Sequence, residues 1–215
     1  MSRLLPLTLA AAALLFVADA GSGPVLAQSS GAQSTGTQVT SAPNTERTEF
    51  SAKMLFDFEG AEKARWRVES DRVMGGRSTG SAEAAEGTLV FDGEVVTEGG
   101  GFSSVRARRE VDLSGYDGIE LRVRGGGRTF ELDVSDGTES RGREVTRRGP
   151  FPTTGSWETV RVPFDSLEET AHGEPVSPGP LNLSAVKSIG IYIIDGKDGP
   201  FRLEVDWIRA YREER

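Results

Sequence analysis

The sequence predicts an all-β protein, an antiparallel β-sandwich of jelly-roll type. From residue 51 onward, apolar and polar residues alternate with a period near two, which is the pattern of strands that bury one face. Glycine, proline, aspartate and serine interrupt this alternation roughly every eight to twelve residues, a spacing typical of the turns in a sandwich. Only residues 164–171 could form a helix, and it would be short. About nine or ten strands in two sheets are therefore expected.

The expected strands are spread over the whole region beyond residue 50. Within residues 118–136, two alternating apolar runs flank a glycine turn, which predicts a hairpin. Residues 188–195 are almost all apolar, as in a strand that is covered on both faces. The candidate strand regions are residues 54–59, 87–96, 101–111, 118–136, 157–164, 188–195 and 201–211.

The amino end predicts an export signal followed by a tether. Arg3 precedes an uncharged apolar run, residues 4–17, and small residues follow at a spacing that signal peptidase accepts. Because this run is shorter than the ~20 residues that span a bilayer as a helix, we expect a cleaved signal peptide, residues 1–27, and no transmembrane span afterwards. Residues 28–50 predict a flexible Ser/Thr/Gln/Gly-rich linker. The folded domain is then 51–215, in a protein expected to be exported, periplasmic or secreted.

Composition and motifs limit the classes of function. The chain has no cysteine, so it cannot rely on disulfides. Its net charge is −8, and an acidic surface does not attract phosphate backbones, so no nucleic-acid partner is expected. The single histidine, His172, lies in a Gly/Pro-rich segment, which argues against a Ser-His-Asp mechanism and a zinc site. The glycines of residues 124–130 precede a strand rather than a helix, which argues against nucleotide binding. No cofactor is expected.

Two carboxylates raise the question of a structural calcium ion. Glu59 and Asp206 fall on the first and last expected strands, which are often neighbours in jelly rolls. Calcium prefers six to eight oxygen ligands, so backbone carbonyls would have to complete such a site. The alternative, which the small number of carboxylates favours, makes both acids outward positions of alternating strands. Residues 195–200 predict a hairpin turn whose Lys197 and Asp198 could touch a partner, and they lack the ligand pattern of a calcium loop.

Arginine gathers in two clusters of an otherwise acidic domain. If Arg106 and Arg108 share a sheet face, their guanidinium groups could bind carboxylates or stack on rings. Pairing with the chain's own abundant acids is the favoured alternative. The members of the clusters are Arg106, Arg108 and Arg109, and Arg141, Arg143, Arg147 and Arg148.

The most distinctive feature is a pair of glycine-rich segments, residues 71–80 and 98–106. Glycine permits positive φ, so both segments can turn sharply and lie close together. Asp71 could bond backbone amides in such a turn or pair with Arg106. The segments form either a buried latch that fixes the end of the sandwich or the wall of a binding cleft, and the sequence leaves both open. The candidate residues for binding a ligand or partner are Asp71, Arg72, Met74, Ser78, Phe102, Ser104 and Arg106.

These segments and their flanks resemble the complex I intermediate-associated protein family. The resemblance covers about residues 55–211. It implies a galactose-binding-like β-sandwich with no established catalytic residues, and the mitochondrial members of the family help to assemble respiratory complex I by binding its assembly intermediates. The residues that carry the resemblance most specifically are Trp66, Asp71, residues 73–76, Ser78, residues 100–102, Ser104 and Arg106.

The resemblance and the residues together predict a non-catalytic binding module. It is expected to act on a protein partner at the cell envelope, with a membrane complex among the candidates, in an assembly or scaffolding role. A carbohydrate-binding module of jelly-roll type is the first alternative, and it would need exposed rings such as Trp66 or Tyr192. A glycoside-processing enzyme is the second alternative, and it would need two carboxylates that face each other across a cleft.

Overall fold

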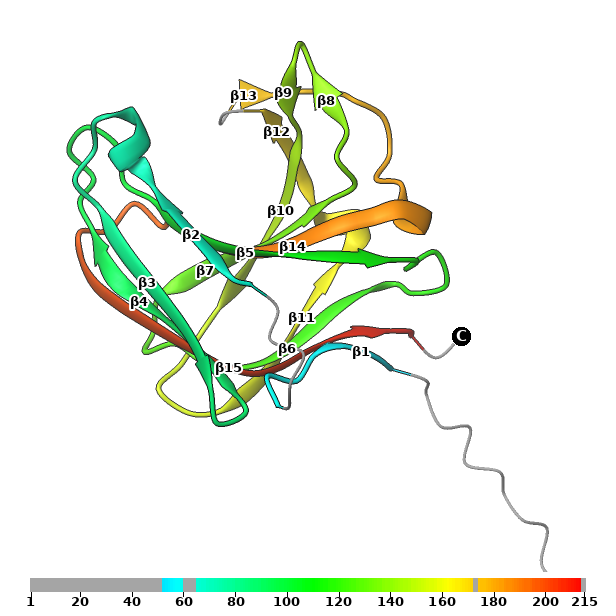
Figure 1. Ribbon diagram of the computed structural model, residues 1–215, viewed down its shortest axis with the longest axis horizontal. Coiled ribbons are helices and arrows are strands. Elements are labelled where there is room, and N and C mark those ends of the chain that lie inside the picture. The colour runs from blue at the N-terminus through cyan, green and yellow to red at the C-terminus, as the bar shows by residue number, and fades with distance from the viewer. Residues whose placement is uncertain (1–51, 60–64, 172–173, 214–215) are drawn as a thin grey trace, which may run out of the picture. The chain divides into compact units, whose positions relative to one another are not determined.

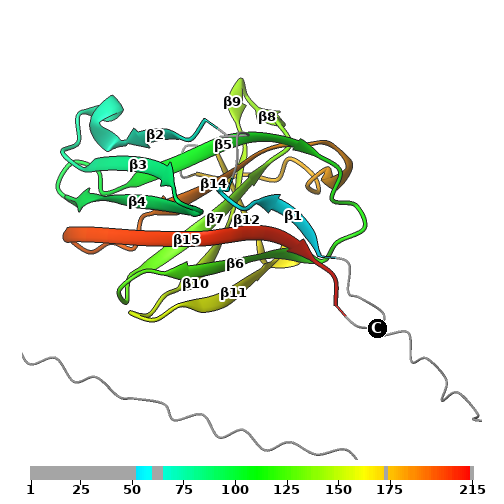
Figure 2. The ribbon, with the colours of Figure 1, turned by 60° about the horizontal axis from the view of Figure 1, so that its bottom comes forward.

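Two antiparallel sheets pack face to face, and they define the two layers seen in Figures 1 and 2. The computed structural model describes residues 52–59, 65–171 and 174–213. Sheet A has the order β11-β6-β15-β4-β3, with β1 paired to β15. Its strands are β1 (Lys53–Phe56), β3 (Thr79–Ala85), β4 (Thr88–Val95), β6 (Gly118–Arg124), β11 (Glu158–Pro163) and β15 (Gly199–Tyr211).

Sheet B has the order β13-β12-β10-β7-β14-β5-β2, and a separate short hairpin, β8–β9, stands out from it (Figure 1). The strands of sheet B are β2 (Arg67–Ser70), β5 (Ser103–Val111), β7 (Thr129–Ser135), β10 (Thr146–Pro152), β12 (Glu168–Ala171), β13 (Glu174–Pro175) and β14 (Val186–Ile193). The hairpin strands are β8 (Glu139–Ser140) and β9 (Arg143–Glu144). The predicted all-β, antiparallel sandwich is confirmed.

Helical structure in the described residues is limited to three short 3-10 helices. These are η1 (Asp71–Met74), η2 (Phe164–Ser166) and η3 (Leu183–Ala185). The short helix expected at 164–171 is therefore a single 3-10 turn followed by β12, because Glu168–Ala171 pair with β10 instead of continuing the helix. None of these helices is long and apolar enough to cross a membrane. The signal peptide and linker predicted for residues 1–50, and His172, lie outside the described residues.

The core lies between the sheets and is built from the inward residue of each alternating pair. In β14, Ile189, Ile191 and Ile193 have no exposed surface, while Ser188 and Tyr192 occupy the opposite face. The period of two places one set of side chains in the core and the other on the outer face of the sheet. Because both sheets follow this rule, the outer face of sheet B collects polar and charged side chains.

The prediction of a hairpin over residues 118–136 is wrong. β6 pairs with β11 and β15 in sheet A, whereas β7 pairs with β10 and β14 in sheet B. The intervening glycines lie in the loop that takes the chain from sheet A to sheet B. The N–H groups of Gly125 and Gly126 donate to the carbonyl of Thr154 at 3.0 and 2.9 Å. Both strands bury their apolar faces in the same core, β6 from sheet A and β7 from sheet B. Alternation alone does not distinguish two strands of one sheet from two strands that face each other.

The turn predicted at residues 195–200 also crosses between the sheets, from β14 to β15, so it is not a hairpin turn. Arg128 lies at the end of the crossing from β6 to β7. It makes a bidentate pair, at 2.7 and 2.8 Å, with Asp195 in the crossing from β14 to β15. Its guanidinium also donates to the carbonyls of Lys197 and Pro200. Asp198 accepts from the amide and hydroxyl of Thr97, so it is tied to the loop after β4. One arginine thus joins two of the places where the chain changes sheet.

Arg128→Gln is expected to lower the free energy of unfolding by about 3 kcal/mol. The change leaves Asp195, whose side chain is 4% exposed, without its partner, and removing one half of a buried pair is costly. Arg202→Gln is the matched control, because Arg202 is exposed and its partner Glu204 also binds Arg124. The control should change stability by less than about 0.5 kcal/mol. Urea unfolding of both variants measures the difference, and equal losses would contradict the role assigned to Arg128.

Candidate functional site

The loop that contains η1 is organised around one buried carboxylate, that of Asp71. Its side chain has no exposed surface, and Oδ1 accepts the amide of Ser78 at 2.9 Å. Oδ2 accepts the Ser78 hydroxyl and the Gly101 amide, both at 2.6 Å. The Asp71 amide in turn donates to the carbonyl of Phe102. Asp71 therefore ties residues 71–78 to residues 100–102, the two glycine-rich segments of the sequence.

Two glycines make this burial possible. A Cβ at Gly76 or at Gly100 would lie far inside van der Waals contact with the carboxyl group of Asp71. Gly75 and Gly101 adopt φ of 90° and 120°, a backbone region that residues with side chains rarely occupy. The glycine runs are therefore required both for close approach and for the sharp turns. In this part of the chain the geometry corresponds to the latch rather than to an open cleft wall.

The environment of Asp71 favours its charged form. Burial raises the pKa of Asp71, but the hydrogen bonds from Ser78 and Gly101 outweigh this effect and hold the pKa below its usual value. A carboxylate with a lowered pKa stabilises the fold at neutral pH, and this stabilisation is lost as the pH falls through the folded-state pKa.

The latch leaves the tip of η1 exposed. Val73 is 69% exposed and Met74 is 65% exposed, and they are the two most exposed large apolar side chains in the described residues. Arg72 beside them is also exposed. Because Asp71 is fixed on one side and Gly75 closes the turn on the other, this apolar pair is presented on an ordered backbone.

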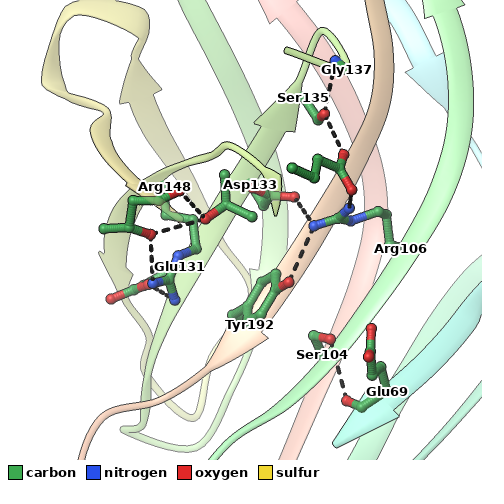
Figure 3. Close-up of polar contacts among 12 residues, drawn as sticks. Glu69, Ser104, Arg106, Glu131, Asp133, Ser135, Gly137, Arg148 and Tyr192 are labelled. Carbon is green, nitrogen blue, oxygen red and sulfur yellow. Dashed lines mark hydrogen bonds and ion pairs between the residues drawn. The ribbon is translucent and has the colours of Figure 1, made fainter. Parts of the chain in front are cut away.

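A second cluster occupies the middle of the outer face of sheet B, where β5, β7 and β14 lie side by side (Figure 3). Arg106 from β5 lies 2.8 Å from Asp133 Oδ2 of β7 and donates to the hydroxyl of Tyr192 at 3.1 Å. Its other terminal nitrogen donates to Glu144 of the β8–β9 hairpin at 3.1 Å. Ser135 donates to the second oxygen of Glu144, which completes a chain of contacts from the sheet to the hairpin. Arg106 pairs with Asp133 and not with Asp71.

Asp133 is the least satisfied charged group in this cluster. It has no exposed surface, and within the described residues neither of its side-chain oxygens has a hydrogen-bond partner of good geometry, although Arg106 lies within ion-pair distance. Burial raises the pKa of Asp133 to about 6, and the charges of Arg106 and Arg148 offset only part of that rise. Asp133 therefore changes its charge close to neutral pH, unlike an ordinary aspartate.

Arg148 and Tyr192 form the other side of the same cluster. Arg148 pairs with Glu131 at 2.9 Å, and its guanidinium lies 5.0 Å from the centre of the Tyr192 ring. The centre of the Phe102 ring lies 6.2 Å from the centre of the Tyr192 ring. Tyr192 is thus covered by neighbours and is only partly exposed. Burial raises the pKa of Glu131, and Arg148 opposes this rise.

A groove of about 630 Å³ lies beside this cluster, toward the β2 edge of sheet B. Ser104 and Ser188 contribute to its floor, and Gly137 and Glu144 line it next to the β8–β9 hairpin. Its cationic lining residues are Arg65, Arg67, Arg106, Arg108 and Lys187, and its acidic ones are Glu69 and Glu144.

The candidate residues named from the sequence divide between these places. Asp71 and Ser78 form the latch, and Phe102 joins it through its carbonyl. Arg72 and Met74 are exposed at the tip. Ser104 and Arg106 lie on the outer face of sheet B, where the Ser104 hydroxyl donates to the carbonyl of Glu69. The structure thus brings the set together in two adjoining groups, and its role in binding stays a prediction.

The expected calcium ligands have other surroundings. β1 does pair with β15, so the first and last strands are neighbours as predicted. Glu59 is exposed and lies next to Gly87, whereas Asp206 is 3.4 Å from Arg122. Among the described residues no group of three acidic or histidine side chains could hold a metal ion. The calcium site at Glu59 and Asp206, which the sequence did not favour and which backbone carbonyls would have to complete, stays a prediction.

Sequence reasoning missed Asp133 and the groove. Asp133 was hidden because residues 131, 133 and 135 occupy the polar positions of an alternating strand, and such positions are ordinarily exposed. Asp133 is buried instead, and Arg106 of β5, which also binds Glu144 of the hairpin, lies against it. Seven positively charged residues in two clusters were recognised, and the expectation that they pair within the chain holds for Arg106, Arg147 and Arg148.

The fold places the chain among the galactose-binding-like β-sandwich modules. The family 11 carbohydrate-binding module from Clostridium thermocellum, in complex with a β-1,3-1,4-mixed-linked tetrasaccharide, has a TM-score of 0.56 at 19% identity, over 75% of this chain and 95% of that module. The same family's module from a cellulosomal cellulase has a TM-score of 0.57 at 18% identity, over 76% and 96% of the two chains. At such identities the likeness shows the fold alone.

Residues 56–205 match the family described as complex I intermediate-associated protein 30, and the chain belongs to that family. The mouse mitochondrial protein of that name is 28% identical over 193 residues, covering 75% of this chain and 57% of its own length. The Caenorhabditis elegans relative is 27% identical over 191 residues, covering 75% and 55%. The chain therefore spans little more than half the length of these curated relatives.

The prediction of an exported, periplasmic or secreted protein is wrong by this comparison. The relatives from mouse, Caenorhabditis briggsae, Caenorhabditis elegans and Drosophila melanogaster are all named as mitochondrial proteins. They point to a mitochondrial location instead. The apolar run at residues 4–17 supported export only through its length and flanking residues, and those features do not specify a compartment by themselves.

Gly100→Ala is expected to lower the free energy of unfolding by about 2–3 kcal/mol, because the new methyl group would displace the carboxylate of Asp71. Gly155→Ala is the matched control, since a Cβ there meets no atom within 4 Å, and it should change stability by less than about 0.5 kcal/mol. Thermal or urea unfolding distinguishes the two. A Gly100→Ala protein as stable as the control would show that the latch has room for a methyl group beside Asp71, which contradicts the close packing seen here.

Asp133 predicts a pH dependence of stability. Its folded-state pKa of about 6 exceeds the unfolded value of 3.8, so its contribution is fully present below pH 3.8 and is lost as the pH rises through 6. From pH 4.5 to 7.5 this loss amounts to about 2 kcal/mol. The difference in unfolding free energy between wild type and Asp133→Asn should change by that amount over this range. Exposed Asp165→Asn is the control, and a constant difference for Asp133→Asn would contradict the assignment.

Proposed function

We propose that the chain is a non-catalytic module that binds a protein partner during the assembly of respiratory complex I. The observation that carries the proposal is the exposed pair Val73 and Met74 on a backbone fixed by the buried Asp71. Exposed apolar side chains on an ordered loop are typical of surfaces that bind other proteins, and methionine adapts well to the shape of a partner. The family name of the relatives, complex I intermediate-associated protein 30, supplies the proposed partner class.

The charged cluster around Arg106 supports binding rather than catalysis. Glu144, one of the two carboxylates that line the groove, accepts from both Arg106 and Ser135, and Asp133 is enclosed without exposed surface. A glycoside-processing enzyme would need two carboxylates placed on either side of a substrate bond. Here Glu144 is engaged in holding the hairpin and the sheet together, which suits a rigid binding surface.

Carbohydrate binding is the alternative function, because the fold is similar to that of carbohydrate-binding modules. Sugar-binding platforms use exposed aromatic rings, and every aromatic side chain of the described residues is buried or partly buried. Trp66 packs against Phe56 and Phe58, and Tyr192 lies under Arg148. Neither ring is open in the way that stacking on a sugar requires. Protein binding is therefore the better supported function, and glycan competition belongs in its test.

The test is affinity capture with the tagged full chain from detergent-solubilised membranes of the cells that express it. Wild type should recover subunits of complex I, and recovery should fall at least about tenfold for Val73→Ser combined with Met74→Ser, because central apolar anchors contribute most of the energy of an interface. Met54→Ser, at an exposed apolar residue of β1, is the matched control. Recovery that mixed-linkage β-glucan abolishes would favour carbohydrate binding instead. Undiminished recovery by the double variant would contradict the assigned surface.

A further inference from the structure

The groove on sheet B concentrates unpaired positive charge. Arg106 is committed to Asp133 and Glu144, and Arg108 pairs with Glu110. By contrast, Arg65, Arg67 and Lys187 make no ion pair within the described residues. The chain has 33 acidic residues and a net charge of −8, so cations without partners in one groove are not a consequence of general composition. Their unpaired donors favour an anionic occupant.

These cations come from both sides of the groove. The side chain of Lys187 lies over Gly137, whose missing Cβ leaves room for the ammonium group. Arg67 lies opposite Arg106 in the β2–β5 register, so both side chains are on the outer face of the sheet. Below them, Ser104 and Ser188 give the groove a polar floor, and both are more than nine-tenths buried. The one acidic residue on the β2 side is Glu69, two positions after Arg67.

The groove also borders the end of a sheet. In the described part of the chain, β2 pairs with β5 and has no second strand beside it in sheet B. Figure 1 shows β2 at the edge of its layer. An edge strand offers backbone N–H and C=O groups to which an extended peptide can add, and this mode of recognition combines main-chain bonds with side-chain pockets. A small anion would use the cations alone and would leave the edge of β2 unused.

We propose that the groove binds an extended acidic segment of a protein partner, which adds to the edge of β2 and directs a carboxylate at every second residue toward the cations of the groove. The period of two in an added strand places alternate side chains on the outer face, beside Arg65 and Arg67 on the β2 side of the groove. The inference rests on the proposed function in that the module acts on a protein partner. It assigns a second contact surface, separate from Val73 and Met74.

The test measures binding of a fluorescein-labelled octapeptide of alternating valine and glutamate to the full-length chain by fluorescence anisotropy. Arg65→Gln combined with Arg67→Gln should weaken binding by about tenfold or more, because both lost cations lie on the β2 side of the groove, nearest the added carboxylates. Both residues are exposed and unpaired in the described chain, so the thermal midpoint should not change. Arg202→Gln, at an exposed arginine of sheet A, is the control and should bind as wild type does.

Two comparison ligands separate the proposal from other anions. A peptide with the same residues in two blocks should bind about fivefold or more weakly, since its carboxylates cannot all lie on one face of a strand. Equal binding of the two peptides would overturn the addition to β2. Tripolyphosphate that binds more tightly than the alternating peptide, through the same two residues, would make the groove a site for small anions and would also overturn the proposal.

A last variant keeps this result independent of the function proposed above. The Val73→Ser and Met74→Ser protein should bind the alternating peptide as tightly as wild type, because those residues do not line the groove. Failure of peptide binding with intact capture of complex I subunits would overturn the groove alone. Intact peptide binding with lost capture would leave the groove in place and count against the proposed partner.

Discussion

The packing of two apolar sheet faces against each other is the constraint on which the rest of the structure depends. β6 and β7 are adjacent in sequence, yet each delivers its buried side chains from a different sheet. Once these faces meet, the remaining residue of each alternating pair must point outward, and the connections must lie at the ends of the sandwich. The outer face of sheet B and the latch around Asp71 are both consequences of that arrangement.

Charged pairs then tie together segments that the core alone would leave separate. Arg128 joins the β6–β7 and β14–β15 crossings between the sheets, and Arg106 joins β5, β7 and the β8–β9 hairpin. Arg147, with almost no exposed surface, joins β10 to Asp136 and Glu169. The chain has no cysteine, so no disulfide joins these segments. Each of these charged pairs is costly to break from one side, which favours a single arrangement of the loops.

The two proposed contact surfaces are continuous through the backbone. β2 ends at Ser70, and Asp71, the anchor of the latch, is the next residue and opens η1. A partner that lay along the edge of β2 would therefore approach the tip that carries Val73 and Met74. The buried carboxylate of Asp71 has a structural role. Through that role it fixes the position of the apolar tip next to the cationic groove. Such a pairing of an apolar anchor with charged surroundings is common where proteins recognise one another.

The sequence by itself determined the fold class, the family and the main strands, because alternation and turn residues are local signals. It also singled out Asp71 and the glycines, but it left latch and cleft as equal alternatives. Only the tertiary structure decided that residues 118–136 cross between sheets, that Arg106 meets Asp133, and that unpaired cations border the edge of β2. These facts depend on which strands become neighbours, and a period of two is the same whichever neighbour a strand acquires.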